Sequence, residues 1–108
     1  MKTGTIVLIP FPYTERTNFK VRPALVVCET KDKYNDLILC AISSVVPMKL
    51  GKFEMAIVHG QGNKLRVPSI IRINRIVTLK QDDVIATLGL LSYSETEQFK
   101  LQFKCLVD

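Results

Sequence analysis

The chain has 108 residues, 47% of them hydrophobic, which is enough for one domain with its own core but too little for two. Fifteen Lys and Arg residues against ten Asp and Glu residues give a formal net charge of +5, which favours a polyanion or an acidic protein as the partner. The cysteines are few and widely spaced, and no apolar stretch has the length of a signal sequence or a membrane span, so a secreted disulfide scaffold and a membrane protein are excluded.

The first predicted strand is the β-branched run Thr5–Ile9. Pro10 and Pro12 follow it, and because proline cannot continue a central ladder, we expect the strand to end there. The polar segment Thr14–Lys20 is then expected to form a loop.

The second predicted strand starts at Pro23 and continues through the apolar run Ala24–Cys28, before the polar turn Glu29–Asp36. Arg22 therefore stands where the loop enters a buried strand. Its guanidinium is permanently charged and forked, which suits a phosphate.

The third predicted strand is Leu37–Ser43, an almost wholly hydrophobic segment that ends in a hydroxyl and is followed by Ser44. Two neighbouring strands thus present polar groups at the rim of the sheet, which is the outline of a small phosphodiester site. Cys28, Cys40 and Cys105 lie in apolar segments and are interpreted as buried thiols.

Two further strands are expected, Phe53–Val58 and Ser69–Leu79, separated by the turn-rich segment His59–Asn63. The longer one alternates, and its apolar face is interrupted only by Arg75, which is interpreted as part of an interface or a buried ion pair.

The C-terminus is predicted to be a helix that begins at a capping box, formed either by Ser94 with Glu97 or by Ser92 with Glu95. An i, i+4, i+7 stripe faces the core. The residues of this stripe are Phe99, Phe103 and Leu106. We therefore expect residues 1–108 to form a single, mainly β domain, a curved sheet or β-barrel with short helices and a C-terminal α-helix.

Several kinds of chemistry are disfavoured by what the sequence lacks. His59 is the only histidine, no cluster has metal-ligand spacing, and the Gly60-Gln61-Gly62 segment lacks the remainder of a nucleotide-binding loop, so no metal and no cofactor are expected. The carboxylates form no catalytic pair and are interpreted as solvated charges; they are Glu54, Asp82 and Asp83.

The remaining polar side chains suit RNA. Its 2′-hydroxyl is an internal nucleophile, so a protein needs only to align it and to stabilise the transition state. We assign transition-state stabilisation to Arg22, because a guanidinium stays protonated at neutral pH. The other candidate residues at the site are Ser43, Ser44, Ser69 and Arg72.

RNA bases are expected to contact the first loop through stacking and phosphate contacts. The residues proposed for these contacts are Tyr13, Arg16, Phe19 and Lys20. An equally supported interpretation of Phe11 and Phe19 is that they do not contact RNA but anchor the loop by packing on the core.

Five segments carry a family resemblance. In order, they are Gly4–Thr14, Val21–Val27, Leu39–Ser44, Val67–Leu79 and Leu88–Ser92. Together they resemble the MazF/PemK/Kid toxins of type II toxin-antitoxin systems, in particular the PemK-like branch.

This resemblance implies an SH3-like barrel, a homodimer, and a metal-independent endoribonuclease that cuts single-stranded RNA to a 2′,3′-cyclic phosphate and a 5′-hydroxyl. It also implies a neutralising antitoxin as partner, which the net charge of +5 predicts to be acidic, and contact with operator DNA only as the antitoxin complex. The cysteine usage independently predicts a place in the cytoplasm. Arg22 matches the catalytic arginine of the family, and Ser43 matches the hydroxyl position that ends the third strand.

The sequence departs from the family at two positions. Thr5 stands where the family has aspartate, and Ser43 stands where it usually has threonine. Two other functions stay open: a gyrase poison of the CcdB type, which shares the fold but needs no Arg22 and Ser43 pair, and a catalytically weakened module that binds nucleic acid or antitoxin.

Overall fold

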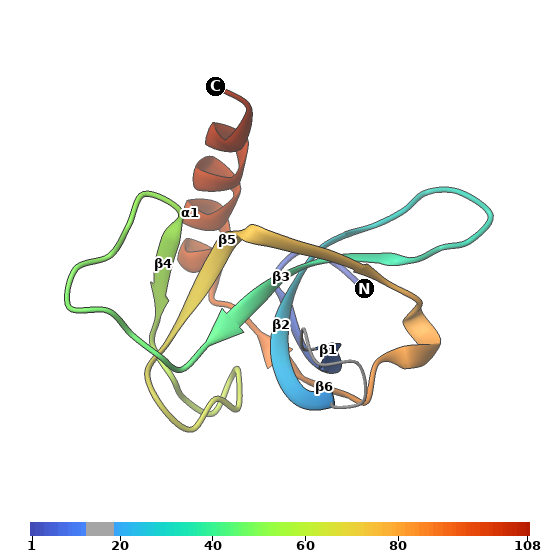
Figure 1. Cartoon of the computed structure of the whole chain (residues 1–108), viewed down its shortest axis with the longest axis horizontal. Coiled ribbons are helices and arrows are strands. Elements are labelled where there is room, and N and C mark those ends of the chain that lie inside the picture. Colours follow the sequence, from blue (N-terminus) through green and yellow to red (C-terminus); the bar gives the residue numbers. More distant parts are fainter. Residues whose placement is uncertain (13–18) are drawn as a thin grey trace.

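The computed structural model describes residues 1–12 and 19–108, and over these residues it confirms a mainly β fold with a C-terminal helix (Figure 1). Its strands are β1 (Thr5–Pro12), β2 (Phe19–Glu29), β3 (Leu37–Ser43), β4 (Glu54–Ile57), β5 (Ser69–Leu79) and β6 (Ala86–Leu90). Its helices are α1 (Tyr93–Lys104) and the short 3-10 turns η1 (Gln81–Asp83) and η2 (Cys105–Val107). Within the part described, no helix combines the length and the apolar character needed to span a membrane.

The strands form one curled antiparallel sheet in the order β4-β5-β3-β2-β1-β6. The loop after β4 reaches the opposite edge, where the Leu90 N–H donates to the carbonyl of Gly62 at 3.1 Å. A Cβ atom on Gly89 would lie 2.1 Å from that same carbonyl oxygen, so this approach requires glycine. The two edges of the sheet are thereby joined into a half-closed barrel.

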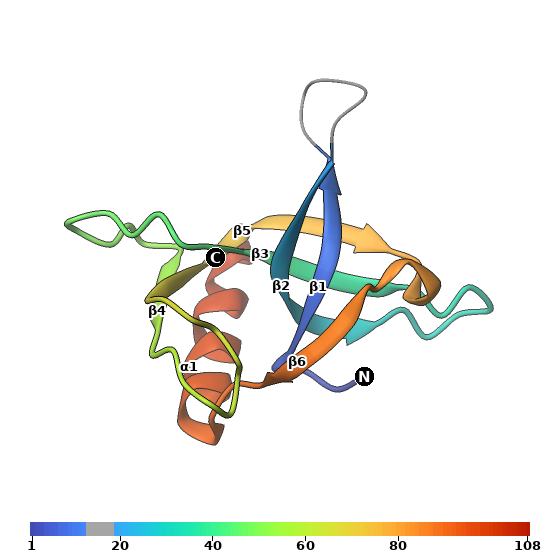
Figure 2. The same ribbon diagram turned by 90° about the horizontal axis from the view of Figure 1, so that it is seen from below.

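Both faces of the central strands are buried, because alternate side chains enter two different cores. The first core contains Ile6, Leu25 and Cys40, and α1 contributes the buried ring of Phe99 to it. Figure 2 shows α1 beside β4 and β5. The second core lies on the other face of the sheet. Its members are Val7, Ile9, Ala24, Val26, Leu37 and Leu39.

The prolines do not bound the first two strands, contrary to the prediction. β1 continues through Pro12, and β2 already begins at Phe19, so Pro23 lies within a strand. Alternate pairs of an antiparallel ladder exchange no hydrogen bonds, and Pro10, Pro12 and Pro23 all fall on one alternate set. On the side away from the β1–β2 ladder these prolines have no strand partner either, because β1 pairs with β6 only as far as Leu8 and β2 pairs with β3 only from Ala24. No ladder bond is lost.

β5 has the predicted bounds but not the predicted single apolar face. Ala41 of β3 lies opposite Arg72, while the preceding Cys40 lies opposite Ile76, so three residues of β5 bulge out of the ladder. As a result, Ile71 and Ile73 enter the first core, whereas Val77 and Leu79 pack against the second.

Of the two predicted capping boxes, the one at Ser92 is confirmed and the one at Ser94 is wrong. Ser92 Oγ accepts from the Glu95 N–H at 3.2 Å, and the Ser92 N–H donates to Glu95 Oε1 at 3.1 Å. The buried Leu91 is still bonded through its N–H to the Gly4 carbonyl of the sheet, at 2.9 Å. Ser92 is therefore the first residue that can turn the chain into the helix.

We expect Ser92→Ala to lower the free energy of unfolding by about 1 kcal/mol, since the first turn of α1 loses its cap. Ser94→Ala is the matched control and should cost much less. Urea denaturation of both variants measures the difference. Equal losses would contradict the assignment of the cap.

The cysteines differ in burial. Cys40 is fully buried, its thiol donates to the Ile73 carbonyl at 3.3 Å, and burial raises its pKa to about 12. Cys28 and Cys105 are only partly buried, which corrects the expectation for these two. All three are unbridged, and Cys40 is an inert core residue.

Candidate active site

Arg22 and Ser43 lie across from each other on neighbouring strands. Ala24 of β2 pairs with Ala41 of β3, and continuing this antiparallel register by two positions places Arg22 opposite Ser43. Residues that lie opposite in such a pair project on the same face, with Cβ atoms about 4.5–5.5 Å apart. Both side chains are half-buried. The sheet thus brings together the two residues that the sequence proposed for catalysis.

Arg72 joins them from β5 on the same face, because it lies opposite Ala41, two residues before Ser43 on β3. The three side chains line one cavity of about 320 Å³, which we call the Ser43 pocket. Its other lining residues are Phe11, Ala41, Ile42, Val45 and Arg75.

The Ser43 hydroxyl is oriented by the chain that follows β3. Its oxygen accepts a hydrogen bond from the Val45 N–H at 3.1 Å. A serine hydroxyl has one proton to donate in addition to its acceptor positions. The Ser43 O–H can therefore donate to an anion in the pocket while the turn holds the oxygen in place.

A second cavity, of about 500 Å³, lies on the other side of Arg22 and is here called the Ser44 pocket. The pairing of Ser43 with Ile70, continued by one position, places Ser44 opposite Ser69 on the opposite face of the sheet. Ser69 is buried, and its hydroxyl donates to the Val67 carbonyl at 3.1 Å. Arg22 lines both pockets, so it forms the wall between them.

The β4–β5 loop adds two basic side chains to the Ser44 pocket, Lys64 and Arg66. Asn63 holds this loop: its buried amide oxygen accepts from the N–H groups of Gly60 and Leu65 at 3.1 and 3.0 Å, and its Nδ2 donates to the Val58 carbonyl at 2.8 Å. Lys64 has a positive φ of 55°, which completes the turn. Sequence reasoning missed both basic residues, since only the pairing of β4 with β5 folds this loop back on the site.

Arg72 is paired with Glu54, its neighbour on β4. The guanidinium Nη1 donates to Glu54 Oε2 at 3.4 Å, and the other carboxylate oxygen accepts from the Gly51 N–H at 2.7 Å. The interpretation of Glu54 as an isolated, solvated charge is therefore wrong, because cross-strand pairing with Arg72 is invisible in the sequence.

For Arg75 the sequence left two interpretations, an interface or a buried ion pair, and the structure contradicts the second. Arg75 belongs to the bulged residues of β5, is exposed, and lines the Ser43 pocket. The expectation of a buried ion pair assumed an uninterrupted alternation along the strand. The bulge removes that alternation and adds a cation to the site.

The predicted base-contacting residues lie mostly beyond what the structure describes. Tyr13 and Arg16 fall outside the described residues, and of Phe19 only the backbone, at the start of β2, is described. Lys20 is exposed and pairs with Phe11. Phe11 packs against the second core and also lines the Ser43 pocket, so its anchoring role is compatible with a place at the site.

Thr5 lies at the other end of β1 from Pro12 and lines neither pocket. Its hydroxyl donates to the Lys2 carbonyl at 2.7 Å, within a turn in which Gly4 has a φ of 96°. The presence of threonine at position 5, where the family has aspartate, therefore affects the turn before β1 and not the two pockets.

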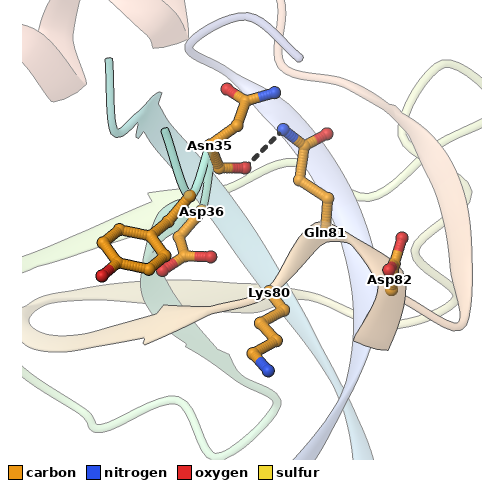
Figure 3. Close-up of a pocket in the computed structure, with 6 residues that line it drawn as sticks. Asn35, Asp36, Lys80, Gln81 and Asp82 are labelled. Atoms are coloured by element: carbon orange, nitrogen blue, oxygen red, sulfur yellow. Dashed lines mark hydrogen bonds between the residues drawn. The ribbon is translucent and has the colours of Figure 1, made fainter. Parts of the chain in front are cut away.

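A further cavity, of about 350 Å³, lies at the opposite end of β3, beside η1 (Figure 3). Its lining carries charges of both signs, and the Gln81 amide donates to the Asn35 carbonyl at 2.8 Å. None of the proposed site residues lines it. Among the residues that the structure describes, no group of His, Cys, Asp and Glu is placed to hold a metal ion.

Comparison with known proteins identifies similar sequences and folds. A family model described as "PemK-like, MazF-like toxin of type II toxin-antitoxin system" matches residues 2–106. No curated protein sequence matches.

Solved structures with the same fold include a mycobacterial endoribonuclease in complex with its cognate antitoxin, with 13% identity, a TM-score of 0.73, and coverage of 99% of this chain and 94% of that one. MazF from Deinococcus radiodurans has 18% identity, a TM-score of 0.71, and coverage of 99% and 96%. A MazE-MazF complex from Deinococcus radiodurans has 18% identity, a TM-score of 0.73, and coverage of 99% and 95%.

Proposed function

Because the chain belongs to the PemK-like, MazF-like toxin family of type II toxin-antitoxin systems, we propose that it is a metal-independent endoribonuclease acting on single-stranded RNA. We propose further that residues 1–108 form a single toxin domain that works in the cytoplasm, where its substrate is found. The continuous sheet and a family match over residues 2–106 support one domain. Similar solved proteins described as endoribonucleases support the reaction class.

The observation that carries this proposal is the meeting of Arg22, Ser43 and Arg72 in one pocket, on one face of three adjacent strands. Two guanidiniums and a hydroxyl supply hydrogen-bond donors to the oxygens of a phosphodiester. RNA supplies its own nucleophile, the 2′-hydroxyl, and because this set holds no ordinary general base, its proton is assigned to water.

In the proposed reaction, the 2′-oxygen attacks the adjacent phosphorus while the bond from phosphorus to the 5′-oxygen breaks. The 2′-hydroxyl gives its proton to water and the leaving 5′-oxygen takes a proton from water, so the products are a 2′,3′-cyclic phosphate and a 5′-hydroxyl. Arg22 stabilises the negative charge that grows on the phosphoryl oxygens, and Ser43 donates to one of them. Arg72 holds the substrate phosphate in the pocket.

The proposed partners follow the same chemistry. An acidic antitoxin segment would cover the basic site, which fits the net charge of +5. Similar structures include an endoribonuclease in complex with its cognate antitoxin and a MazE-MazF complex. We also propose a homodimer, with operator DNA contacted only as the antitoxin complex. Base contacts are assigned to Tyr13, Arg16, Phe19 and Lys20, with Ser44 and Ser69 beside Arg22.

Incubation of the purified protein with a mixed-sequence single-stranded RNA in EDTA tests the proposal. We expect cleavage at short sequences, with cyclic phosphate ends detected by mass spectrometry, and loss of cleavage where the ribose 5′ to the cut is 2′-deoxy. Intact RNA, or cleavage that requires added Mg²⁺, would count against it. Inhibition of gyrase supercoiling by the protein, without RNA cleavage, would instead favour the gyrase-poisoning alternative.

A further inference from the structure

A third cavity adjoins the Ser43 pocket across Arg72. It has a volume of about 280 Å³, lies between the β3–β4 loop and β5, and is here called the Lys52 pocket. Its lining residues are Gly51, Lys52, Phe53, Glu54, Arg72, Asn74 and Arg75. Arg72 and Arg75 line this cavity and the Ser43 pocket alike, so the two cavities are neighbours along one basic surface.

The β5 bulge builds one wall of the Lys52 pocket. Asn74 and Arg75 belong to the residues that leave the β3–β5 ladder, and both are exposed. A bulge redirects side chains that a regular strand would use for pairing. The neighbouring Ile73 N–H donates to the Phe53 carbonyl at 2.8 Å, which fastens the bulge to the loop that forms the opposite wall.

The opposite wall is held at several points. Lys52 Nζ lies 5.3 Å from the centroid of the Phe53 ring. The backbone carbonyl of Lys52 accepts a hydrogen bond from Gln102 Nε2 of α1 at 3.5 Å. Glu54 bonds to the Gly51 N–H and to Arg72. With three cations and one carboxylate, the pocket keeps a net charge of +2.

We propose that the Lys52 pocket binds the phosphate of a nucleotide next to the one cleaved, with Glu54 as a positioning residue for Arg72; this rests on the proposed function. Nη1 of Arg72 is directed to Glu54, and a guanidinium has five N–H donors, so the remaining ones can serve both cavities. Successive phosphates of one strand then occupy the Ser43 pocket and the Lys52 pocket. A phosphate is favoured over an acidic protein because the cavity is small, polar and continuous with the phosphodiester site.

The test uses Lys52→Gln, with Lys52→Arg to restore the charge and Lys31→Gln as a matched charge loss in the β2–β3 turn. The probe is a labelled 2′-deoxy oligonucleotide of a sequence that the wild-type protein cleaves. We expect Lys52→Gln to bind it several-fold more weakly and to reduce the slope of log K against log salt by about 0.7, the value for one phosphate on a single strand. Lys52→Arg should keep the wild-type slope, and so should Lys31→Gln.

Two shorter probes, one lacking the 5′ nucleotide and one lacking the 3′ nucleotide, locate the contact. With one of the two, the wild-type protein should lose affinity while Lys52→Gln loses none, because the variant already lacks the contact. An unchanged salt slope in Lys52→Gln, or losses that simply multiply at both ends, would overturn the proposal. So would Lys52→Gln weakening the binding of a polyglutamate peptide while leaving the oligonucleotide unaffected. A wild-type protein that cleaves no RNA would refute the proposed function itself.

Discussion

Arg22→Ala is expected to lower kcat by about 10³-fold or more, the cost of removing a preorganised donor and its charge from a phosphoryl transition state. This corresponds to about 4 kcal/mol of lost transition-state stabilisation. The reason lies in its position: Arg22 stands opposite Ser43 and forms the wall between the Ser43 pocket and the Ser44 pocket. Single-turnover cleavage of a labelled RNA measures the effect directly.

Arg22→Lys separates charge from geometry. Lysine keeps the positive charge but lacks the planar fork, so we expect activity between that of Arg22→Ala and the wild type. Lys31→Gln, in an exposed turn at the far end of β3, should cleave at the wild-type rate. Thermal unfolding of each variant shows whether the fold is retained. Cleavage by a folded Arg22→Ala at the rate of the wild type would remove Arg22 from the mechanism.

Ser43→Ala is expected to lower kcat by about 10²-fold with little change in KM, because the hydroxyl donates to an oxygen whose charge grows in the transition state. The measurement is steady-state cleavage over a range of RNA concentrations. A loss confined to KM would mean that Ser43 binds the ground state alone.

Ser43→Thr provides the conservative comparison. Threonine keeps the hydroxyl that accepts from the Val45 N–H, and its methyl group restricts the χ1 rotamer. We expect activity equal to that of the wild-type protein or a few-fold higher. Because Ser43→Ala also removes the bond to Val45, the unfolding temperature of all three proteins must be compared. A kcat of Ser43→Ala equal to that of Ser43→Thr would contradict a catalytic role for this hydroxyl.

Most of the fold could be predicted from local patterns. The apolar run Leu37–Ser43 and the bounds of Ser69–Leu79 are confirmed, because β-branched and apolar runs are long enough there to define strands. The prolines misled the prediction, since whether Pro23 is tolerated depends on which side of β2 has a partner at that point. β6 (Ala86–Leu90) was missed because a short segment with Gly89 becomes a strand only through pairing with β1.

For the candidate site, the sequence by itself determined the chemical groups: a permanent cation at Arg22, hydroxyls at Ser43 and Ser44, and an excess of basic residues. These follow from residue type and from the ends of apolar runs, which are local properties. The tertiary structure alone decided which groups meet. Antiparallel register sets Arg22 against Ser43 and Arg72 against Glu54, and the β5 bulge turns Arg75 outward. Register and bulges depend on partners distant in the sequence, so no local pattern records them.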